Sequence, residues 1–556
     1  MKISASFILY LATFIMGGCG LAYEYTLSRV AADLLGNSAR QWALVIGAMM
    51  FCMGIGADLQ KRLDDHLLLD KFIGAEILLG LLGGCGPLVL LFTYGMAPSY
   101  YIIVQYLFIS SIGLLLGFEL PMIARLNSVY ISQLEINLGK VLKMDYVGAL
   151  AGALIWVFLL PRFFTLIESA FILGLLNLGA ATVLLLYFRV KITLSKRLWL
   201  ALLSTSLLLT IGFFQARNWT ASAEQYLYRD RIIFSKTTRY QHIVLTQSKA
   251  AEVACYINGS LQFNSADEYI YHENLVHPAF VLARHQHRVL ILGGGDGLAA
   301  REVLKYPKVK DLVLCDLDPE MTDLARKHPV FIELNHNSLG NARITVLKNN
   351  RLILPDQKEK IRVTNQHHRF GSQPEAVAQV SVINLDAAAL LENLAGKFDV
   401  IIVDFPDPNN EELAKLYSRT FYHRLASHLS IDGIFVQQAT SPYHAKEAFL
   451  CIGRSMEAAG LSVIPYHDNV PSFGEWGWWI GGHRERWAAK ELPKSLKETL
   501  KKTTTLAVPT RYLTAELIHA SLDFGKKQLD TEETEINTLV NHKIFTYYLK
   551  GWQTGY

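Results

Sequence analysis

Acidic residues follow two short apolar runs in this chain, and a third apolar run ends in a cluster of glycines. Residues 289–292 lead directly into Gly293, Gly294 and Gly295, and the next apolar run ends at Asp316, about twenty residues past the turn. A glycine turn lets the backbone come close to a ligand, and an acid at this spacing commonly binds the two ribose hydroxyls of a nucleoside. The pattern predicts a strand, turn, helix and strand that together hold a nucleoside.

Leu298 stands where a dinucleotide fingerprint of the form GxGxxG has its third glycine. This argues against a nicotinamide dinucleotide and leaves a nucleoside that lacks a pyrophosphate. The adenosyl group of a sulfonium such as S-adenosylmethionine is the common case. An ordinary glycine-rich turn is the alternative interpretation of this stretch.

A second pair of acids suits amine chemistry. The apolar run 400–403 ends at Asp404, with Asp407 three residues later in a turn stiffened by Pro406 and Pro408. Ligands in open α/β sheets lie at the carboxyl ends of the strands. Two carboxylates there could bind a cationic amine and remove its proton. For either acid taken alone, a helix cap is the simpler interpretation.

These motifs, in this order, resemble the polyamine aminopropyltransferases, the spermidine synthase family. The resemblance covers roughly residues 229–482. It rests on GGGDG at 293–297, CDLD at 315–318, NLDA at 384–387, DFPDP at 404–408 and RYQHIVL at 239–245. Two later segments, QATSPY at 438–443 and VPSFGEWG at 470–477, resemble the branch of the family that is fused to a membrane domain.

The resemblance implies roles for individual residues. Asp404 is implied as the general base, Asp407 as a polyamine ligand and Asp316 as the ribose ligand. The glycine loop comprises Gly293, Gly294, Gly295 and Gly297. The other implied positions are Asp386 and Ala387 beside the adenine, Gln241 against the nucleoside, His272 and Asp296 at the amine ends, and Gln438 in the same pocket.

The chain departs from the family pattern in three places. Asp316 stands where most members carry Glu, and the proline that usually follows the DxxDP turn is replaced by the stretch 409–418. An extra polar stretch within 351–380 separates two strands that could each precede the adenine acid. We choose Asp386, because the next helix and strand follow it at the usual spacing and the pair Asn349-Asn350 offers no carboxylate. His367 and His368 lack acid or Cys partners at ligand spacing, so we interpret them as part of a solvated loop and not a metal site.

The amino-terminal part predicts a membrane domain. The chain has 556 residues, is 51% hydrophobic and has a mean hydropathy of +0.23, with the apolar excess before residue 215. A signal peptide at 1–20 is the weaker alternative, because the apolar run continues and further runs follow. Apolar runs of about membrane length predict seven spans near 6–24, 41–55, 72–93, 101–118, 147–160, 166–188 and 198–214. The cysteines predict neither a disulfide framework nor a zinc site; they are Cys19, Cys52, Cys85, Cys255, Cys315 and Cys451.

Two arguments about topology disagree. Basic residues gather in the loops after the second, fourth and sixth spans, which the positive-inside rule places in the cytoplasm. Seven crossings then put the carboxyl-terminal part outside, although its expected donor is an intracellular metabolite. We favour a cytoplasmic catalytic domain, with one span not crossing or one span missed.

Acids in or beside the spans allow two interpretations. A charge at membrane depth suggests cation or polyamine handling, but acids near span ends are reached by water. We favour anchoring or a structural role for this domain. The acids are Glu24, Glu76, Glu119, Asp145 and Glu168.

The predicted architecture has four parts. A multi-span helical membrane domain (1–215) precedes a linker with a small antiparallel β domain (216–280), a Rossmann-like catalytic domain of the methyltransferase type (281–490) and a helical tail (491–556). Asn258-Gly259 is a hairpin signal within the β domain. We assign no chemistry to the tail.

The resemblance implies transfer of an aminopropyl group from decarboxylated S-adenosylmethionine to putrescine or a related amine, which gives spermidine and methylthioadenosine. We expect no cofactor beyond this co-substrate, no metal and no nucleic-acid partner, because the net charge is only +4. The lipid bilayer is an expected partner, and a homo-oligomer stays open. The alternatives are an S-adenosylmethionine-dependent methyltransferase and a polyamine-binding transporter or sensor.

Overall fold

The computed structural model describes residues 4–36, 38–65, 67–346, 378–488 and 490–553. It divides into two compact units, Met1–Arg231 and Ile232–Tyr556. His367, His368 and the pair Asn349-Asn350 lie outside the described residues.

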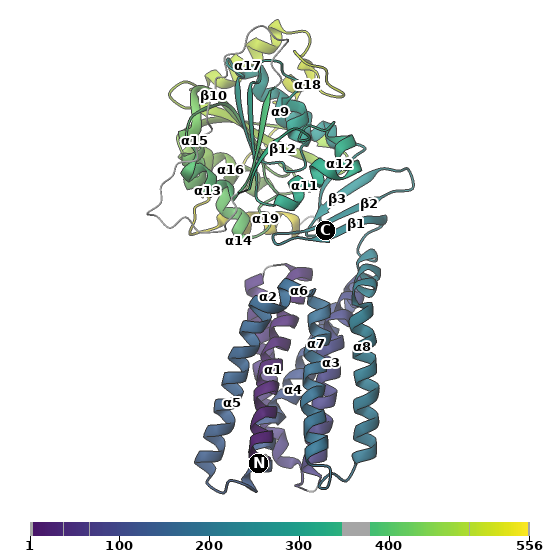
Figure 1. The fold of residues 1–556 in the computed structure, drawn as a ribbon. Helices are drawn as coiled ribbons and strands as arrows, with labels where there is room; N and C mark the ends of the chain where they lie inside the picture. Colours follow the sequence, from purple (N-terminus) through teal and green to yellow (C-terminus); the bar gives the residue numbers. More distant parts are fainter. Residues whose placement is uncertain (1–3, 37, 66, 347–377, 489, 554–556) are drawn as a thin grey trace. The chain divides into compact units, whose positions relative to one another are not determined.

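Seven helical segments in the first unit are long and apolar enough to cross a membrane, in agreement with the seven apolar runs (Figure 1). Helix α8 continues to Gln225, past the end of the apolar part at 215, because no glycine or proline lies between residues 213 and 225. The segments are α1 (Ala5–Leu35), α2 (Ser38–Leu59), α3 (Leu68–Met96), α4 (Tyr101–Ser128), α5 (Leu134–Leu154) with the π-helical turn Ile155–Leu159 and α6 (Leu160–Phe163), α7 (Leu166–Tyr187) and α8 (Ser195–Gln225).

Small residues bring the membrane helices together. A Cβ atom on Gly148 of α5 would lie against the backbone oxygen of Phe14 in α1, and one on Gly152 would collide with Gly18. Helices in lipid associate through such close backbone approaches, since lipid is as apolar as their side chains. The glycines on α1 and α5 therefore set the packing of this pair.

The second unit begins with a four-stranded sheet. Its strands follow chain order: β1 (Arg231–Thr237), β2 (His242–Gln247), β3 (Val253–Ile257) and β4 (Ser260–Asn264). The antiparallel strands β3 and β4 are joined by Asn258 and Gly259, which both have positive φ, 50° and 81°. This is the hairpin turn that the Asn-Gly pair predicts.

The main sheet of the second unit has eight strands in the order β11-β12-β10-β9-β5-β6-β8-β7. The strands from β10 to β7 pair in parallel, and β11 and β12 form an antiparallel edge. This confirms the predicted Rossmann-like fold. The strands are β5 (Arg288–Gly293), β6 (Asp311–Asp316), β7 (Arg343–Val346), β8 (Gln379–Asn384), β9 (Phe398–Asp404), β10 (Leu429–Gln438), β11 (Leu461–Val470) and β12 (Gly474–His483).

Helices cover both faces of this sheet (Figure 1). Alternate residues of β5 are therefore buried in two different apolar cores. Val289 and Ile291 belong to one apolar cluster, and Leu290 and Leu292 belong to the other. The first cluster includes residues of α9 (Glu268–Leu282), α10 (Leu298–Val303) and α17 (Glu491–Lys502); the second includes residues of α13 (Ala387–Asn393), α15 (Arg419–His428), α16 (Lys446–Ala458) and α19 (Lys543–Gln553).

The carboxyl-terminal segment therefore packs on both faces of the sheet. Leu492, Leu496 and Leu500 of α17 are buried in the first core. Ile544 and Phe545 of α19 are buried in the second. The short helix α18 (Ala515–Ala520) lies between these two helices in the chain.

Candidate active site

The acids predicted from the sequence gather at one edge of the main sheet. β9, β5, β6 and β8 are consecutive parallel strands, so their carboxyl ends meet at the same edge. Gly293 lies directly opposite Asp404, and Asp316 lies opposite Asn384. The glycine turn therefore lies between the two acids, and Asp386 follows two residues after Asn384.

The glycine turn binds Asp316 through its backbone. The Gly295 N–H donates to Oδ2 of Asp316 at 3.0 Å, and the Asp318 N–H donates to Oδ1 at 2.8 Å. A Cβ atom on Gly295 would lie 2.5 Å from the same Oδ2, so only glycine fits. Burial raises the pKa of Asp316 to about 7, even though both backbone hydrogen bonds act to lower it.

Gly294 and Gly297 shape the rest of this turn. Gly294 has φ 64°, and a Cβ atom there would lie 3.1 Å from Oδ2 of Asp404. Gly297 precedes α10 with φ 81°. These left-handed conformations explain the glycines, because other residues adopt them at a cost.

Asp404 receives one hydrogen bond from a residue that the sequence analysis did not single out. The hydroxyl of Tyr271, on α9, donates to Oδ1 of Asp404 at 2.7 Å. Burial raises the pKa of Asp404 to about 6, and the charge of Asp296 acts in the same direction. The positive charge of His272 and the Tyr271 hydrogen bond oppose this rise. Asp404 is half-buried and still ionised at neutral pH.

A buried ion network surrounds His272. Its Nδ1 contacts Oε2 of Glu268 at 2.9 Å, and Glu268 in turn receives two bonds from Arg301 at 2.7 and 3.0 Å. Burial acts to lower the pKa of His272, but the hydrogen bond and charge of Glu268, together with Asp296 and Asp404, raise it to about 9. His272 is thus a cation at neutral pH, within reach of the charges of Asp296 and Asp404.

Asp296 is the acid inside the glycine turn. Its Oδ1 accepts the Leu298 N–H at 2.9 Å, and its pKa is raised by burial. The two carboxylates of Asp296 and Asp404 outnumber the one imidazolium of His272, so this group of interacting charges has an acidic excess. Such an excess favours a positively charged ligand.

Three side chains hold Asp407. Thr440 Oγ1 donates to its Oδ2 at 3.0 Å, Gln438 Nε2 lies 3.4 Å from its Oδ1, and Tyr548 of α19 is hydrogen-bonded to the same carboxylate. Burial raises the pKa of Asp407 to about 6, while these hydrogen bonds act to lower it. Gln438 also donates to the hydroxyl of Tyr417, at 3.0 Å.

The remaining predicted residues line the nucleoside side of the edge. Asp386 caps α13 by accepting the Ala389 N–H at 3.1 Å, and Ala387 is the buried first residue of that helix. The Leu385 N–H donates to the carbonyl of Asp316 at 3.1 Å, which places this turn beside Asp316. Asp386 therefore has the capping role that any acid at a strand end can have, at a position that also faces the predicted nucleoside site.

Gln241 lies in the turn between β1 and β2. Its N–H donates to Oγ1 of Thr238 at 3.0 Å, and that hydroxyl donates to Oδ2 of Asp318 at 2.7 Å. The turn is thus attached to the loop that follows Asp316. This attachment puts the small sheet next to the predicted nucleoside site.

Sequence reasoning missed the hydroxyl-bearing partners of the acids, namely Tyr271, Thr440 and Tyr548, and also Tyr417, which bonds to Gln438. Tyr271 is next to the predicted site residue His272 in the sequence, and this position was a signal for it. Thr440 lies in the QATSPY segment, which was used only to identify the family branch. Tyr548 had no such signal, because it reaches Asp407 from more than a hundred residues away in the chain.

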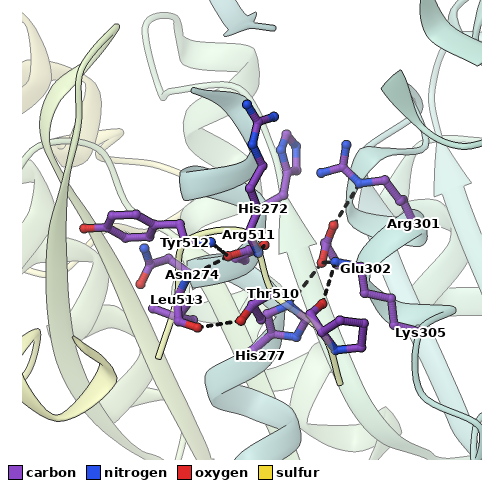
Figure 2. A network of polar contacts seen from close by, with 12 residues as sticks. His272, Asn274, His277, Arg301, Glu302, Lys305, Thr510, Arg511, Tyr512 and Leu513 are labelled. Carbon is purple, nitrogen blue, oxygen red and sulfur yellow. Dashed lines mark hydrogen bonds and ion pairs between the residues drawn. The ribbon is translucent and has the colours of Figure 1, made fainter. Parts of the chain in front are cut away.

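A second buried network of polar contacts joins α9 to the segment that precedes α18 (Figure 2). Glu273 accepts the backbone N–H groups of Arg511, Tyr512 and Leu513 at 2.6, 2.9 and 2.8 Å. This carboxylate locks the segment before α18 onto the helix that carries Tyr271 and His272.

Glu273, His277 and Glu302 lie within 4.8 Å of one another, a spacing that could hold a metal ion. Glu302 is already paired with Arg301 at 2.8 Å and Lys305 at 2.6 Å, and its pKa is lowered to about 2 despite burial because His277 and Lys305 bond to it. Since both carboxylates are satisfied by protein donors, we interpret this cluster as structural.

Comparison with known proteins finds close relatives over the whole length. A family profile described as "Spermine/spermidine synthase domain" matches residues 268–354 and 367–490. The chain is 36% identical to polyamine aminopropyltransferase 2 of Ralstonia nicotianae over 98% of both chains, and 35% identical to polyamine aminopropyltransferase of Leptospira interrogans, also over 98% of both. A crystal structure of a spermidine synthase in complex with the transition-state analogue AdoDATO overlaps 54% of this chain and 88% of that one, with 22% identity and a TM-score of 0.41.

Proposed function

This chain belongs to the polyamine aminopropyltransferase family, and from that premise we propose that its second unit transfers an aminopropyl group from decarboxylated S-adenosylmethionine to putrescine or a related diamine. The observation that carries the proposal is the position of Asp404. It lies at the end of β9, opposite the glycine turn, and accepts a hydrogen bond from Tyr271. A base in this position lies between a predicted nucleoside site and an acidic pocket.

The proposed reaction is a single displacement. The neutral amine nitrogen attacks the methylene carbon next to the sulfonium sulfur, the carbon–sulfur bond breaks and methylthioadenosine leaves with the electron pair. The new ammonium then loses a proton to Oδ2 of Asp404, while Oδ1 stays bonded to Tyr271. A sulfonium is already a good leaving group, so this chain has to align the reactants and accept one proton.

We propose that Asp407 binds the far ammonium group of the diamine. Its carboxylate is held by Thr440, Gln438 and Tyr548 and is three residues from the base. A carboxylate that is fixed by neutral donors keeps its charge for a ligand. The distance between Asp404 and Asp407 along the turn then favours an acceptor with two amino groups.

We propose that Asp316 holds the ribose of the donor, with Asp386 and Ala387 beside the adenine and Gln241 closing over the nucleoside. Two contacts support this. The Gly295 N–H donates a hydrogen bond to Asp316, and Thr238 joins the Gln241 turn to Asp318. We place Asp296 and His272 at the aminopropyl end of the donor. A free ammonium group suits the acidic excess there, whereas a carboxylate does not.

The apolar helices suggest that the first unit is associated with a membrane, and we propose that the catalytic unit faces the cytoplasm, where its donor is made. The basic loops argue for the opposite side if all seven helices cross. A Lys249→Cys variant, in the exposed turn between β2 and β3, separates the two placements. Labelling by a membrane-impermeant thiol reagent only after permeabilisation supports the cytoplasmic side, and labelling of intact cells excludes it.

The test of the activity uses purified full-length protein in detergent. We expect release of methylthioadenosine from decarboxylated S-adenosylmethionine when putrescine or another diamine is present, with formation of the aminopropylated amine detected by mass spectrometry. Methyl transfer from intact S-adenosylmethionine, without aminopropyl transfer, would replace the proposal by a methyltransferase. Binding of polyamine without turnover of either donor would favour a sensor or transporter.

A further inference from the structure

The membrane unit contains a buried carboxyl pair that the proposed reaction does not use. Glu76 of α3 is fully buried and Glu119 of α4 is 5% exposed, and the two side chains are hydrogen-bonded to each other. A hydrogen bond between two carboxyl groups needs at least one proton, so the pair as a unit has at most one negative charge.

No cationic side chain in the described part of the first unit pairs with either carboxyl. Glu76 accepts one hydrogen bond from Nδ2 of Asn177 on α7 at 3.0 Å, and Glu119 has Asp145 of α5 as a further charged neighbour. An uncompensated charge at this depth costs several kcal/mol, and ionisable groups inside membrane proteins commonly mark an ion or proton site.

Several oxygens around the pair have no donor among the described residues. They come from four helices: Glu76 Oε1, Glu119 Oε1, Asn177 Oδ1 and the Tyr23 hydroxyl of α1. The Asn177 amide contacts Glu76 directly, and the Tyr23 hydroxyl is close enough to both acids to feel their charge. Asn177 is 0% exposed and Tyr23 is 1% exposed. Buried acceptors are normally bonded, so this many open acceptors around one carboxyl pair point to a ligand.

Glu76 and Glu119 lie at a similar depth along their two helices. Glu76 is eight residues from the start of α3 and Glu119 is nine residues from the end of α4. α3 and α4 are consecutive membrane helices, so these two helix ends are at the same end of the bundle. At 1.5 Å per residue both acids are roughly 12–14 Å from that helix end. Helices of 29 and 28 residues are longer than a hydrocarbon core of about 30 Å, so the acids lie inside the core but nearer to this end than to its middle.

We propose that Glu76, Glu119, Asn177 and Tyr23 bind one singly charged cation, either an alkali-metal ion or a primary ammonium group. The oxygen-only ligand set selects a hard cation or an N–H donor over a soft metal. Because the pair has at most one negative charge, it selects a ligand charge of no more than +1. This site concerns the first unit and goes beyond the proposed transferase activity.

The experiment measures hydrogen–deuterium exchange in the full-length protein in nanodiscs of phosphatidylcholine and phosphatidylglycerol. Sodium, potassium, ethylammonium and calcium chlorides are compared at equal ionic strength with N-methylglucamine chloride, whose cation is too large for the site. Peptides around Glu76 and Glu119 should exchange at least threefold more slowly with one of the singly charged cations. The arm that gives protection identifies an alkali-metal ion or an ammonium group.

Substitutions assign the protection to these residues. Glu76→Gln and Glu119→Gln should abolish it and Tyr23→Phe should weaken it, whereas Glu24→Gln, on the same helix as Tyr23 but outside the cluster, should leave it unchanged. Equal exchange in all salts for the wild-type protein overturns the proposal even if a variant fails to fold. Protection by calcium alone, or protection that persists in Glu76→Gln, also overturns it. The readout is hydrogen exchange and not transferase activity. The cation site can therefore be confirmed or excluded even if the proposed transferase activity is not found.

Discussion

The two carboxylates of the DFPDP turn differ in what holds them, and this difference gives them different tasks. Among the described residues Asp404 has one hydrogen-bond partner, Tyr271, which bonds to Oδ1 and leaves Oδ2, the oxygen nearer to Gly294, without a donor. Asp407 is bonded by three side chains. A base needs a free oxygen that can accept a proton, whereas a group that binds an ammonium ion benefits from being held in place.

Asp404→Asn should therefore lower kcat by about 10²–10⁴ while donor affinity changes little. In the wild-type protein kcat/KM should decrease as the pH is lowered through a pKa near 6, because protonation of Asp404 below that pH removes the base. This decrease is the acid limb of the pH profile. Steady-state kinetics across pH 5 to 9 and donor titration check both statements. Near-normal turnover of the variant would take Asp404 out of the mechanism.

Tyr271→Phe should move that acid limb to higher pH by about one unit. The phenol stabilises the charged carboxylate, so its loss raises the pKa of Asp404 further. Tyr269→Phe on the same helix, whose ring faces Arg511, is the matched control and should leave the limb unchanged. An unmoved limb in Tyr271→Phe would mean that Asp404 is not the titrating group.

Asp296 should decide between donors. Intact S-adenosylmethionine has a carboxylate near this acid, whereas the decarboxylated donor has only an ammonium group, so we expect at least a hundredfold preference for the latter. Asp296→Asn should weaken binding of the decarboxylated donor by about 2–3 kcal/mol. Calorimetric titration of both donors into both proteins measures this. Equal wild-type affinities would favour a methyltransferase.

At the scale of single residues, the sequence predicted the acids of the candidate site better than the side chains that are hydrogen-bonded to them. Asp316 and Asp404 follow apolar runs directly, so their place at strand ends could be read from the pattern. Tyr271 and Thr440 bond to these acids through tertiary packing, which has no local periodicity. The pKa values could not be predicted either, because burial is their largest cause.

At the scale of elements, the carboxyl-terminal helix α19 is part of the candidate site. The sequence predicts a helix there but cannot show what it packs against. In the structure, Gly551 approaches the carbonyl of His444 so closely that a Cβ atom would lie 2.6 Å from it, and Trp552 stacks on the His444 ring at 5.2 Å. This packing brings Tyr548 to Asp407.

Tyr548→Phe should raise KM for the diamine about fivefold to tenfold, with a smaller change in kcat, because Asp407 loses one of the bonds that orient it. Tyr547→Phe is the matched control. That hydroxyl donates to Glu533 at 2.6 Å, away from the site, so the variant should keep the wild-type KM. Equal effects of the two substitutions would reduce α19 to a structural element.

At the scale of the whole molecule, the apolar runs end before the first predicted strand and the structure divides into two units at Arg231, while the four predicted domain ranges stay predictions. The exact end of the last membrane helix could not be read from composition, since α8 continues through a polar stretch that still favours helix. The 351–377 stretch lies outside the described residues, so its predicted role stays a prediction.

A chain that begins at Tyr226, after the end of α8, should fold and keep measurable transferase activity. Its two cores form within the second unit, and every residue of the candidate site lies beyond this point. Circular dichroism and the methylthioadenosine assay check this. A folded truncated chain that binds donor without turnover would show that the membrane unit takes part in the reaction.

The contact between Tyr548 and Asp407 also sets an order of events during biosynthesis. Translation runs from the amino end, so the apolar helices leave the ribosome before the base, and the base before the tyrosine that completes the amine site. A nascent chain that has not yet released α19 lacks this bond. If Asp407 binds the amine as proposed, the site is therefore complete only after α19 has been synthesised, which is after all of the apolar helices.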